Sequence, residues 1–318
     1  MLHNALNTFL FALNITAPIF VMLFLGIWLK KRSMINDEFI KIASQLVYNI
    51  GLPVMLFITS TTTDISHITD WNLLIAFCVM TALVFIGSLL TAHWHCKDAR
   101  DEGVFIQGAF RGNLVILGLA FCANAYGEKG LALASLPVAM TVVFYNVLSV
   151  YVLNRSLHHA SNSFMPTLIG VAKNPLIIAI FAGFAVNALH ITLPGVIMDS
   201  GKYLSQMVLP LALICIGGSL SIERLTRMDT TAISACVWKL MLSPLIACAI
   251  AIGLGLRGDA LAVLFLLAAS PTATISFVMV QAMKGNGELA ANIIAHSTLW
   301  SLITVTLGLW ILQIMHWV

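Results

Sequence analysis

Ten long stretches of this chain are almost free of charged residues, and together they fill nearly its whole length. Two of them, 103–127 and 230–256, contain one base each, Arg111 and Lys239, and no acid. A helix needs about 20 apolar residues to cross a bilayer, so the pattern predicts an all-α membrane protein with ten transmembrane helices. The eight stretches without any Asp, Glu, Lys or Arg are 1–29, 42–63, 71–96, 130–154, 174–198, 203–222, 260–283 and 289–318.

Composition agrees with this class. Only 9% of the residues are charged, whereas soluble domains have about 25%. The hydrophobic stretches are continuous and lack the residue-by-residue alternation that membrane β-strands need. The spans contain no acid, no carboxylate pair and no set of metal ligands, so we expect neither an enzyme nor a cofactor. The net charge of +3 comes from the loops and predicts no nucleic-acid partner.

The loops differ strongly in their content of Lys and Arg. Alternate loops place eleven of these bases on one side and three on the other, and the richer side of a membrane protein is cytoplasmic. With ten spans, both termini then lie outside the cytoplasm. The three outer bases are Lys129, Lys202 and Arg257, and the cytoplasmic ones are Lys30, Lys31, Arg32, Lys41, Lys97, Arg100, Arg155, Lys173, Arg224, Arg227 and Lys284.

The longest connection lies at the middle of the chain. It divides the sequence into a first five-helix repeat at 1–153, a cytoplasmic central loop at 154–172 and a second five-helix repeat at 173–318. Because five is odd, a duplicated half enters the membrane from the opposite face, which predicts an inverted repeat. Short matches spaced by 157 to 160 residues support it: Leu52-Pro53 with Leu209-Pro210, Gly127-Glu128 with Gly287-Glu288, and Arg111-Gly112-Asn113 with Pro271-Thr272-Ala273.

Spans four and nine carry helix-breaking residues near their middle. Pro271 removes a backbone donor, and Ser270 before it is a natural N-cap with proline at the first helical position. Gly112 and Asn113 offer a comparable break. If both helices unwind, two half-helix N-termini meet near the midplane with unpaired N–H groups, which is an anion site. The alternative is a pair of ordinary kinks that neighbouring groups satisfy.

The two bases inside spans sharpen this hypothesis. Arg111 lies about 12 Å along its helix, and an ionisable residue at that depth predicts a function. A buried base without a counter-charge is unfavourable, and a carboxylate cargo would supply that charge. For Lys239, snorkelling or bonding to backbone carbonyls is the alternative. Asn49, Gln107 and Asn146 either line a cavity or bond helices together.

Four segments resemble the auxin efflux carrier family, whose bacterial members are permeases for malate, malonate or other organic acids. The resemblance covers nearly the whole chain. It implies two inverted five-span repeats of the bile-acid-symporter type, with a scaffold domain from spans 1, 2, 6 and 7 and a transport domain from spans 3–5 and 8–10. The segments are Asn49-Ile50-Gly51-Leu52-Pro53, residues 110–118 from Phe110 to Gly118, Lys239 to Pro244, and Ser270-Pro271-Thr272-Ala273.

By position, Asn113 and Pro271 match the family's crossover residues in spans four and nine. This chain lacks a proline after Asn113, and Gly112 replaces its effect. It also lacks the long hydrophilic central loop of the plant carriers, which indicates a bacterial protein of the inner (plasma) membrane.

The leading hypothesis is therefore a secondary carrier of small organic anions that works by elevator-type alternating access. Arg111 attracts the carboxylate, N–H groups around Asn113 and Thr272 bind it, and Thr274 and Ser276 supply hydroxyls. Gly112, Ser270 and Pro271 shape the same site. Two alternatives stay open: a sodium-coupled symporter of the bile-acid type and a membrane sensor that transports nothing. The coupling ion, H⁺ or Na⁺, and a homodimeric state also stay open; the lipid bilayer is the remaining expected partner.

Overall fold

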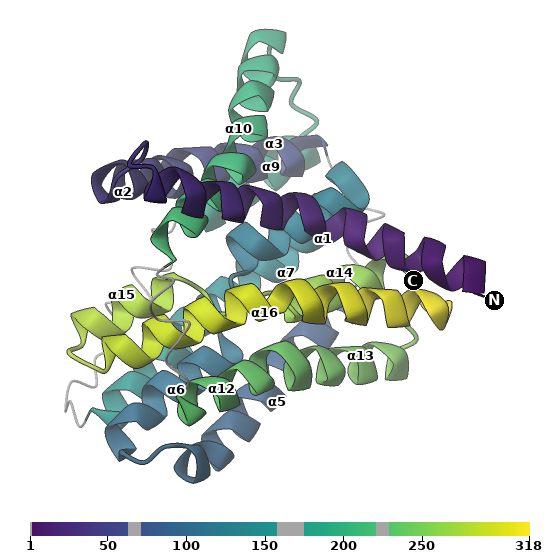
Figure 1. Cartoon of the computed structure of the whole chain (residues 1–318). Helices are drawn as coiled ribbons and strands as arrows, with labels where there is room; N and C mark the ends of the chain where they lie inside the picture. The colour runs from purple at the N-terminus through teal and green to yellow at the C-terminus, as the bar shows by residue number, and fades with distance from the viewer. Residues whose placement is uncertain (1, 63–70, 158–174, 221–228) are drawn as a thin grey trace.

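The computed structural model describes residues 2–62, 71–157, 175–220 and 229–318. Within these ranges the chain is built from helices, which lie in two groups (Figure 1). The upper group contains α1, α2, α3, α9 and α10, and the lower group contains α5, α6, α7 and α12 to α16. The prediction of an all-α membrane protein is confirmed at this level, and the count of ten spans in inverted repeats stays a prediction.

The upper group packs two pairs of helices against each other. Helix α3 packs on α9, α1 packs on α10, and α10 also contacts α2 and α3. A π-helical turn, η1, joins α2 to α3 without a loop. The bounds are α1 Leu2–Lys31, α2 Asp37–Leu46, η1 Val47–Gly51, α3 Leu52–Thr62, α9 Pro175–Ala188 and α10 Gly195–Ser219.

The lower group surrounds two short helices, α6 and α14. Every residue of α14 from Leu261 to Ala268 is buried, and so is every residue of α6 from Gly103 to Phe110. The bounds are α5 Trp71–His95, η2 Ala99–Asp101, α6 Glu102–Phe110, η3 Leu114–Gly118, α7 Leu119–Ser156, α12 Thr230–Val237, η4 Trp238–Leu242, α13 Ser243–Gly253, α14 Gly258–Ala268, α15 Ile275–Ala282 and α16 Gly287–Ile314.

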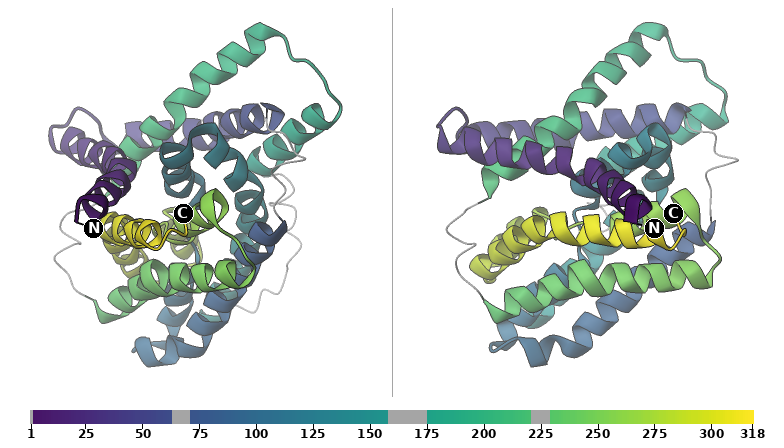
Figure 2. Two further views of the ribbon diagram at one scale, coloured as in Figure 1. Left: turned by 90° about the vertical axis from the view of Figure 1, so that its right-hand side faces the viewer. Right: turned by 45° about the vertical axis from the view of Figure 1, so that its right-hand side comes forward.

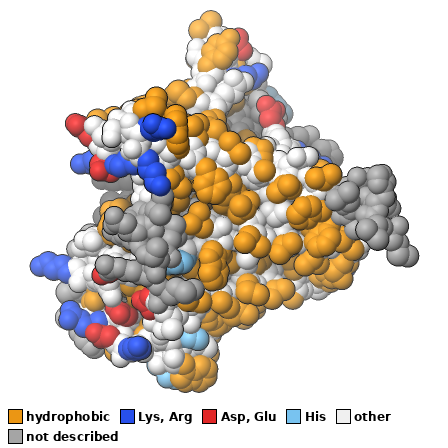
Figure 3. Space-filling model, in the orientation of Figure 1, with side chains coloured by type: hydrophobic (Ala, Val, Ile, Leu, Met, Phe, Trp, Pro, Cys, Tyr) orange, Lys and Arg blue, Asp and Glu red, His pale blue; other side chains and the backbone are white. Residues whose placement is uncertain are grey.

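Seven helical segments among the described residues are long and apolar enough to cross a membrane. Helices α9 and α14 are shorter apolar helices. The predicted spans four and nine do not count as single long helices because both are interrupted. A broad hydrophobic face covers the molecule, and charged side chains gather along the edge where α2 and α6 lie (Figure 3). The chain is thus built as a multi-pass membrane protein.

The predicted boundary between spans six and seven is wrong. Helix α9 ends at Ala188, and α10 already begins at Gly195, so Asp199 and Lys202 lie inside a helix and not in a loop. Pro194 starts that helix because its fixed φ suits a helical beginning. Both charges remain exposed, since the first turns of α10 project beyond their neighbours (Figures 1 and 2).

The predicted central loop at 154–172 falls largely outside the described residues. Its beginning is helical, because α7 continues to Ser156. Inside α7, Gly127 has φ 58° and ψ −138°, which separates the end of span four from span five. Both chain termini lie on the same side of the molecule (Figure 1).

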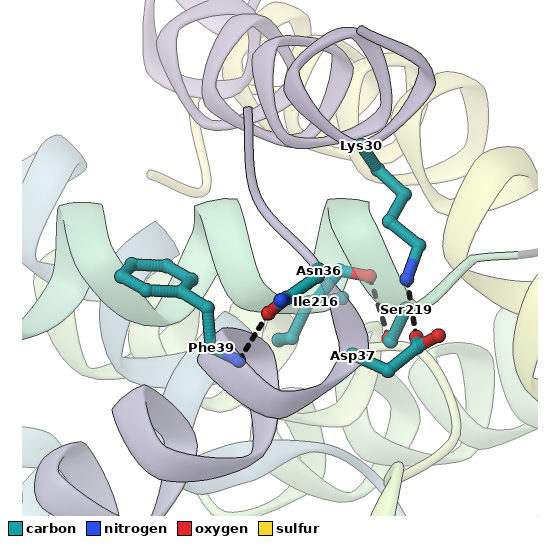
Figure 4. A network of polar contacts seen from close by, with 6 residues as sticks. All are labelled: Lys30, Asn36, Asp37, Phe39, Ile216 and Ser219. Carbon is teal, nitrogen blue, oxygen red and sulfur yellow. Dashed lines mark hydrogen bonds and ion pairs between the residues drawn. The ribbon is translucent and has the colours of Figure 1, made fainter. Parts of the chain in front are cut away.

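Polar contacts join the end of α1 to the start of α2, next to the end of α10, where the hydroxyl of Ser219 donates to the carbonyl of Ile216 in its own helix (Figure 4). The side chain of Asn36 accepts a hydrogen bond of 2.8 Å from the backbone N–H of Phe39 and thereby caps α2. Lys30 forms an ion pair with Asp37 in the first turn of that helix. Because an acid at the N-terminus and a base at the C-terminus both suit the helix dipoles, the contacts fix the sharp turn between α1 and α2.

Glycine allows α1 and α10 to touch through their backbones. A Cβ atom on Gly217 would lie 2.0 Å from the carbonyl oxygen of Leu23, and one on Gly26 would lie 2.2 Å from that of Ile214. No side chain can occupy either position without moving one helix away from the other. Small residues at such contacts are typical of helix pairs in membranes.

We predict that Gly217→Ala lowers the stability of the protein by about 1–3 kcal/mol, because the new methyl group displaces α1. Thermal unfolding of the purified protein in detergent measures the effect. Gly253→Ala is the matched control, since a Cβ atom there meets nothing within 4 Å. Equal melting temperatures for the two variants would show that α1 and α10 do not depend on this contact.

Candidate functional site

Both predicted helix breaks are present. Helix α6 ends at Phe110, and Arg111 leaves the helical conformation with φ −84° and ψ 95°. Helix α14 ends at Ala268, and the next helix begins only at Ile275. The alternative of ordinary kinks is therefore wrong, because in both spans the helix stops and the chain continues as an extended segment.

The two extended segments pair with each other. Gly112 and Thr272 form an antiparallel β-bridge, in which the N–H of Asn113 donates to the carbonyl of Pro271 at 2.6 Å and the N–H of Ala273 donates to that of Arg111 at 3.0 Å. Pro271 lacks an N–H group but presents its carbonyl to the partner segment. The backbone groups freed by the two breaks thus satisfy each other inside the protein, as a membrane interior requires.

Gly112 is required by the space at the crossing. A Cβ atom on this residue would lie 2.7 Å from Ser270 Oγ and 3.0 Å from Lys239 Nζ. The segments 111–113 and 270–273 and the end of the Lys239 side chain therefore meet at one buried point. We call this point the crossing.

Thr272 joins the crossing to two further helices. Its hydroxyl donates to the carbonyl of Gly108 in α6 at 2.8 Å, and its N–H donates to the hydroxyl of Ser297 in α16 at 3.1 Å. Sequence reasoning did not single out Ser297. The available signal was the set of polar residues along α16, all of which are buried: Asn292, His296, Ser297, Ser301 and Thr306.

The predicted N-cap at Ser270 is wrong. Its hydroxyl donates back to the carbonyl of Leu267 at 2.7 Å and so closes the end of α14. The N-cap residue of the following helix, α15, is Thr274, and its side chain makes no capping hydrogen bond. Pairing with residues 111–113 explains the difference, because the bridge holds 271–273 extended and delays the new helix by one turn.

Arg111 is held by α7 in this structure. Its Nη1 atom donates to the carbonyl of Tyr145 at 3.0 Å and to the hydroxyl of Ser149 at 2.8 Å, and Nη2 donates to the side chain of Asn146 at 2.8 Å. Its Nε atom is buried without a hydrogen-bond partner. All three partners are neutral, so none of them offsets the positive charge of the guanidinium. Its donors join α7 to the end of α6.

Lys239 reaches the crossing from η4. Its side chain is fully buried, and Nζ donates to the carbonyl of Ala268, the last residue of α14, at 2.8 Å. The hydroxyl of Ser243 donates to the same carbonyl at 3.4 Å. Of the roles that the sequence left open for this lysine, the bond to a backbone carbonyl is confirmed.

The two bases thus lie at two equivalent places. Arg111 is the C-cap residue of α6, and Lys239 bonds the C-terminal residue of α14. A helix C-terminus carries a partial negative charge of about half a unit. Lys239 therefore covers the negative end of α14, whereas Arg111 stands at the end of α6 and its guanidinium bonds α7.

The two positive helix ends are not covered in this way. The first backbone bond of η3 runs from Gly118 to the carbonyl of Asn113 at 2.9 Å, and the first bond of α15 runs from Ser276 to that of Ala273 at 3.0 Å. The N–H groups at 114–117 and 274–275 precede these bonds and have no acceptor in their own helix. Next to them, Asn113 Nδ2 and Ser276 Oγ are buried without a partner.

Of the other predicted site residues, three lie near the crossing and one lies away from it. Gln107 lies in α6 facing α15, with its amide nitrogen 3.7 Å from the sulfur of Met279 and its Oε1 atom without a partner. Thr274 is half-buried at the start of α15, and Asn146 contributes through its bond to Arg111. Asn49 is different, because it lies exposed on η1 in the upper group.

The crossing is closed to solvent in this conformation. The side chains of Arg111, Asn113, Thr272 and Ser276 are at most 5% exposed. A cavity of about 150 Å³ opens elsewhere, between α5, α6 and α7 at the Glu102 end of α6. A ligand from water therefore reaches the crossing only when helices move.

We predict that Thr272→Val lowers the stability by about 1–2 kcal/mol, because the carbonyl of Gly108 loses its buried donor at a nearly unchanged side-chain volume. Thermal unfolding in detergent measures the change. Thr304→Val is the control, since that partly exposed hydroxyl bonds only within its own helix. A loss no larger than that of the control would contradict the role of Thr272 in joining the two broken spans.

Comparison with known proteins gives a consistent result. The family described as "Membrane transport protein" matches residues 11–310. An uncharacterized transporter of Methanocaldococcus jannaschii is 26% identical over 311 residues, 94% of this chain and 98% of that protein. A Rhizobium meliloti protein named "Putative malonate transporter" is 28% identical over 306 residues, 92% of this chain and 93% of that protein.

The resemblance to the auxin efflux carriers is thereby confirmed, since the matching family is theirs. That family is one of membrane transporters and not a class of enzymes. The chain belongs to the membrane transport protein family and is a membrane transporter.

Proposed function

We propose that this transporter is a secondary carrier of small organic anions of the malonate and malate class. The observation that carries the proposal is the charge arrangement at the crossing. Lys239 bonds the negative end of α14 and Arg111 adds a positive charge near the end of α6, whereas the positive ends of η3 and α15 keep unbonded N–H groups. Such helix ends bind anions through backbone donors. The relative named for malonate supports this substrate class.

A dicarboxylate suits this arrangement better than a single carboxylate does. The two helices begin on opposite sides of the bridge between Gly112 and Thr272. One carboxylate of the substrate binds the start of η3 with the amide of Asn113, and the other binds the start of α15 with the hydroxyls of Thr274 and Ser276. Arg111 contributes its charge and the free Nε donor, because α7 occupies its other donors.

Polar contacts at the two ends of the crossed spans support the inverted repeat. At one end, Asn286 before α16 donates to Asp101 before α6 at 3.1 Å. At the other end, Lys129 in α7 pairs with Asp259 at the start of α14 at 2.6 Å. Asp259 follows Asp101 by 158 residues, and Asn286 follows Lys129 by 157. Equivalent positions in the two halves thus make equivalent contacts at opposite ends.

The grouping of helices supports elevator-type movement. The upper group corresponds to the scaffold of spans 1, 2, 6 and 7, and the lower group corresponds to the transport domain. Polar contacts between the described parts of the two groups include the Thr16 and Thr306 hydroxyls, 2.7 Å apart, and the amide of Asn124, which donates to the carbonyls of Asn14 and Ile15. An interface that is mainly apolar allows sliding, and the closed crossing requires such a motion.

The proposed setting is the bacterial inner membrane, with both termini outside the cytoplasm. In this orientation the charged edge of Figure 3 faces the cytoplasm, which agrees with the eleven bases in those loops. A homodimer remains a proposal that rests on no contact in the structure.

We predict that Asn113→Ala reduces malonate transport at least about tenfold, because a hydrogen bond to a charged group contributes about 1.5–3 kcal/mol. Uptake of labelled malonate into proteoliposomes loaded with unlabelled malonate is the measurement. The melting temperature should stay unchanged, since the amide nitrogen has no partner to lose.

Asn187→Ala serves as the matched control in the upper group. Its amide donates to the carbonyl of Thr61 at 2.7 Å, so this variant should melt earlier but keep the native affinity for malonate. Unaltered uptake by Asn113→Ala would remove the crossing from the binding site. Protein that binds malonate but moves none across the membrane would favour the sensor alternative.

A further inference from the structure

Lys239 is not among the groups proposed to contact the anion. It approaches the crossing on the side of Gly112 and Ser270, and its ammonium bonds the carbonyl at the C-terminus of α14. Burying a charged amine here is unfavourable, because no acid among the described residues forms an ion pair with it. A neutral side chain such as serine would satisfy the same carbonyl, and Ser243 already contacts it.

We propose that the ammonium of Lys239 is a tethered cation that takes the place of a coupling ion at the end of α14, so that this carrier works without Na⁺. The inference rests on the proposed anion transport and specifies its ion requirement. Transporters with broken helices bind Na⁺ through unwound backbone carbonyls and half-helix C-termini. In this chain the corresponding carbonyl, that of Ala268, is already bonded by Lys239 Nζ.

The surroundings of Nζ leave no place for an added ion. Lys239 is fully buried and Ser270 is fully buried beside it. Even one methyl group on Gly112 would come within 3.0 Å of Nζ. The hydroxyls of Thr272 and Ser270 donate to the carbonyls of Gly108 and Leu267, which holds both side chains in place beside this point. A free cation therefore enters only if the lysine is removed.

The charges at the crossing agree with this inference. Arg111 stands at the C-terminus of α6, and Lys239 bonds the C-terminal carbonyl of α14. The two fixed positive charges equal the two negative charges of a dicarboxylate. The loaded crossing is then neutral without any added ion, which lowers the electrostatic cost of moving it through the low-dielectric membrane.

The first test uses the native protein. Labelled malonate uptake is measured in proteoliposomes with Na⁺ on both sides and again with choline in its place. We expect rates that agree within about twofold, because the proposed carrier has no Na⁺ site that choline would leave empty. A tenfold change in rate would correspond to a difference of about 1.4 kcal/mol in binding. A rate at least about tenfold lower in choline would overturn the inference and favour sodium coupling.

The second test uses the melting temperature and needs no transport. Lys239→Ala removes the four side-chain atoms beyond Cβ, and methylammonium restores the last two of them, Cε and Nζ. The variant is purified in methylammonium chloride and compared with a sample exchanged into choline chloride. We expect methylammonium to raise its melting temperature by at least about 3 °C, because a ligand stabilises the folded state that binds it.

Two controls separate this effect from general salt effects. Lys239→Met fills the same space with an uncharged chain, so methylammonium should not raise its melting temperature. Lys202→Ala removes an exposed lysine at the outer end of α10 and should likewise not respond. Equal melting of Lys239→Ala in both salts, or failure to obtain it even with methylammonium, would contradict the inference.

The two proposals fail in different ways. If the native protein transports no malonate under any condition, the proposed substrate is wrong, and the melting experiment still decides whether Lys239 holds a cation site. If the native protein transports malonate but requires Na⁺, anion transport stands and the role proposed for Lys239 is wrong.

Discussion

The backbone pairing between Gly112 and Thr272 is the interaction on which the rest of the site depends. Two helices stop inside an apolar environment, where every freed N–H and C=O group needs a partner. The bridge satisfies four of these groups and holds the ends of α6, η3, α14 and α15 at one place. Without it, each break would leave its backbone unsatisfied, and neither half-helix would have a fixed direction.

Four helix ends meet at the crossing, and each carries a partial charge. The side chains around the crossing determine which of these helix ends stay free to bind a ligand. Lys239 bonds the end of α14, and Arg111 stands at the end of α6. The positive ends keep their unbonded donors, with Asn113 and Ser276 beside them. The proposed selectivity for an anion thus rests on which dipoles the protein leaves open, more than on direct contact between the guanidinium and a cargo.

Several features were predictable because they follow from local chemistry. The apolar stretches predicted membrane helices, and glycine and proline located both breaks, since each residue disfavours a continuous helix wherever it occurs. The N-cap at Ser270 was predicted wrongly because pairing with a segment some 160 residues away keeps 271–273 extended. The start of α10 was misplaced because exposed charges were taken to mark a loop, although a helix that projects beyond its neighbours accommodates them.

The sequence by itself determined that the chain crosses a membrane, where two of its helices break and which two bases are buried, because these properties depend on the residue and its near neighbours. Only the tertiary structure decided that the breaks pair with each other, that Arg111 is held by α7, and that Lys239 and Ser297 reach the crossing. These partners lie 25 to 164 residues apart along the chain. Hydrogen bonds of that range depend on how helices pack, and a linear pattern of residue types does not contain that information.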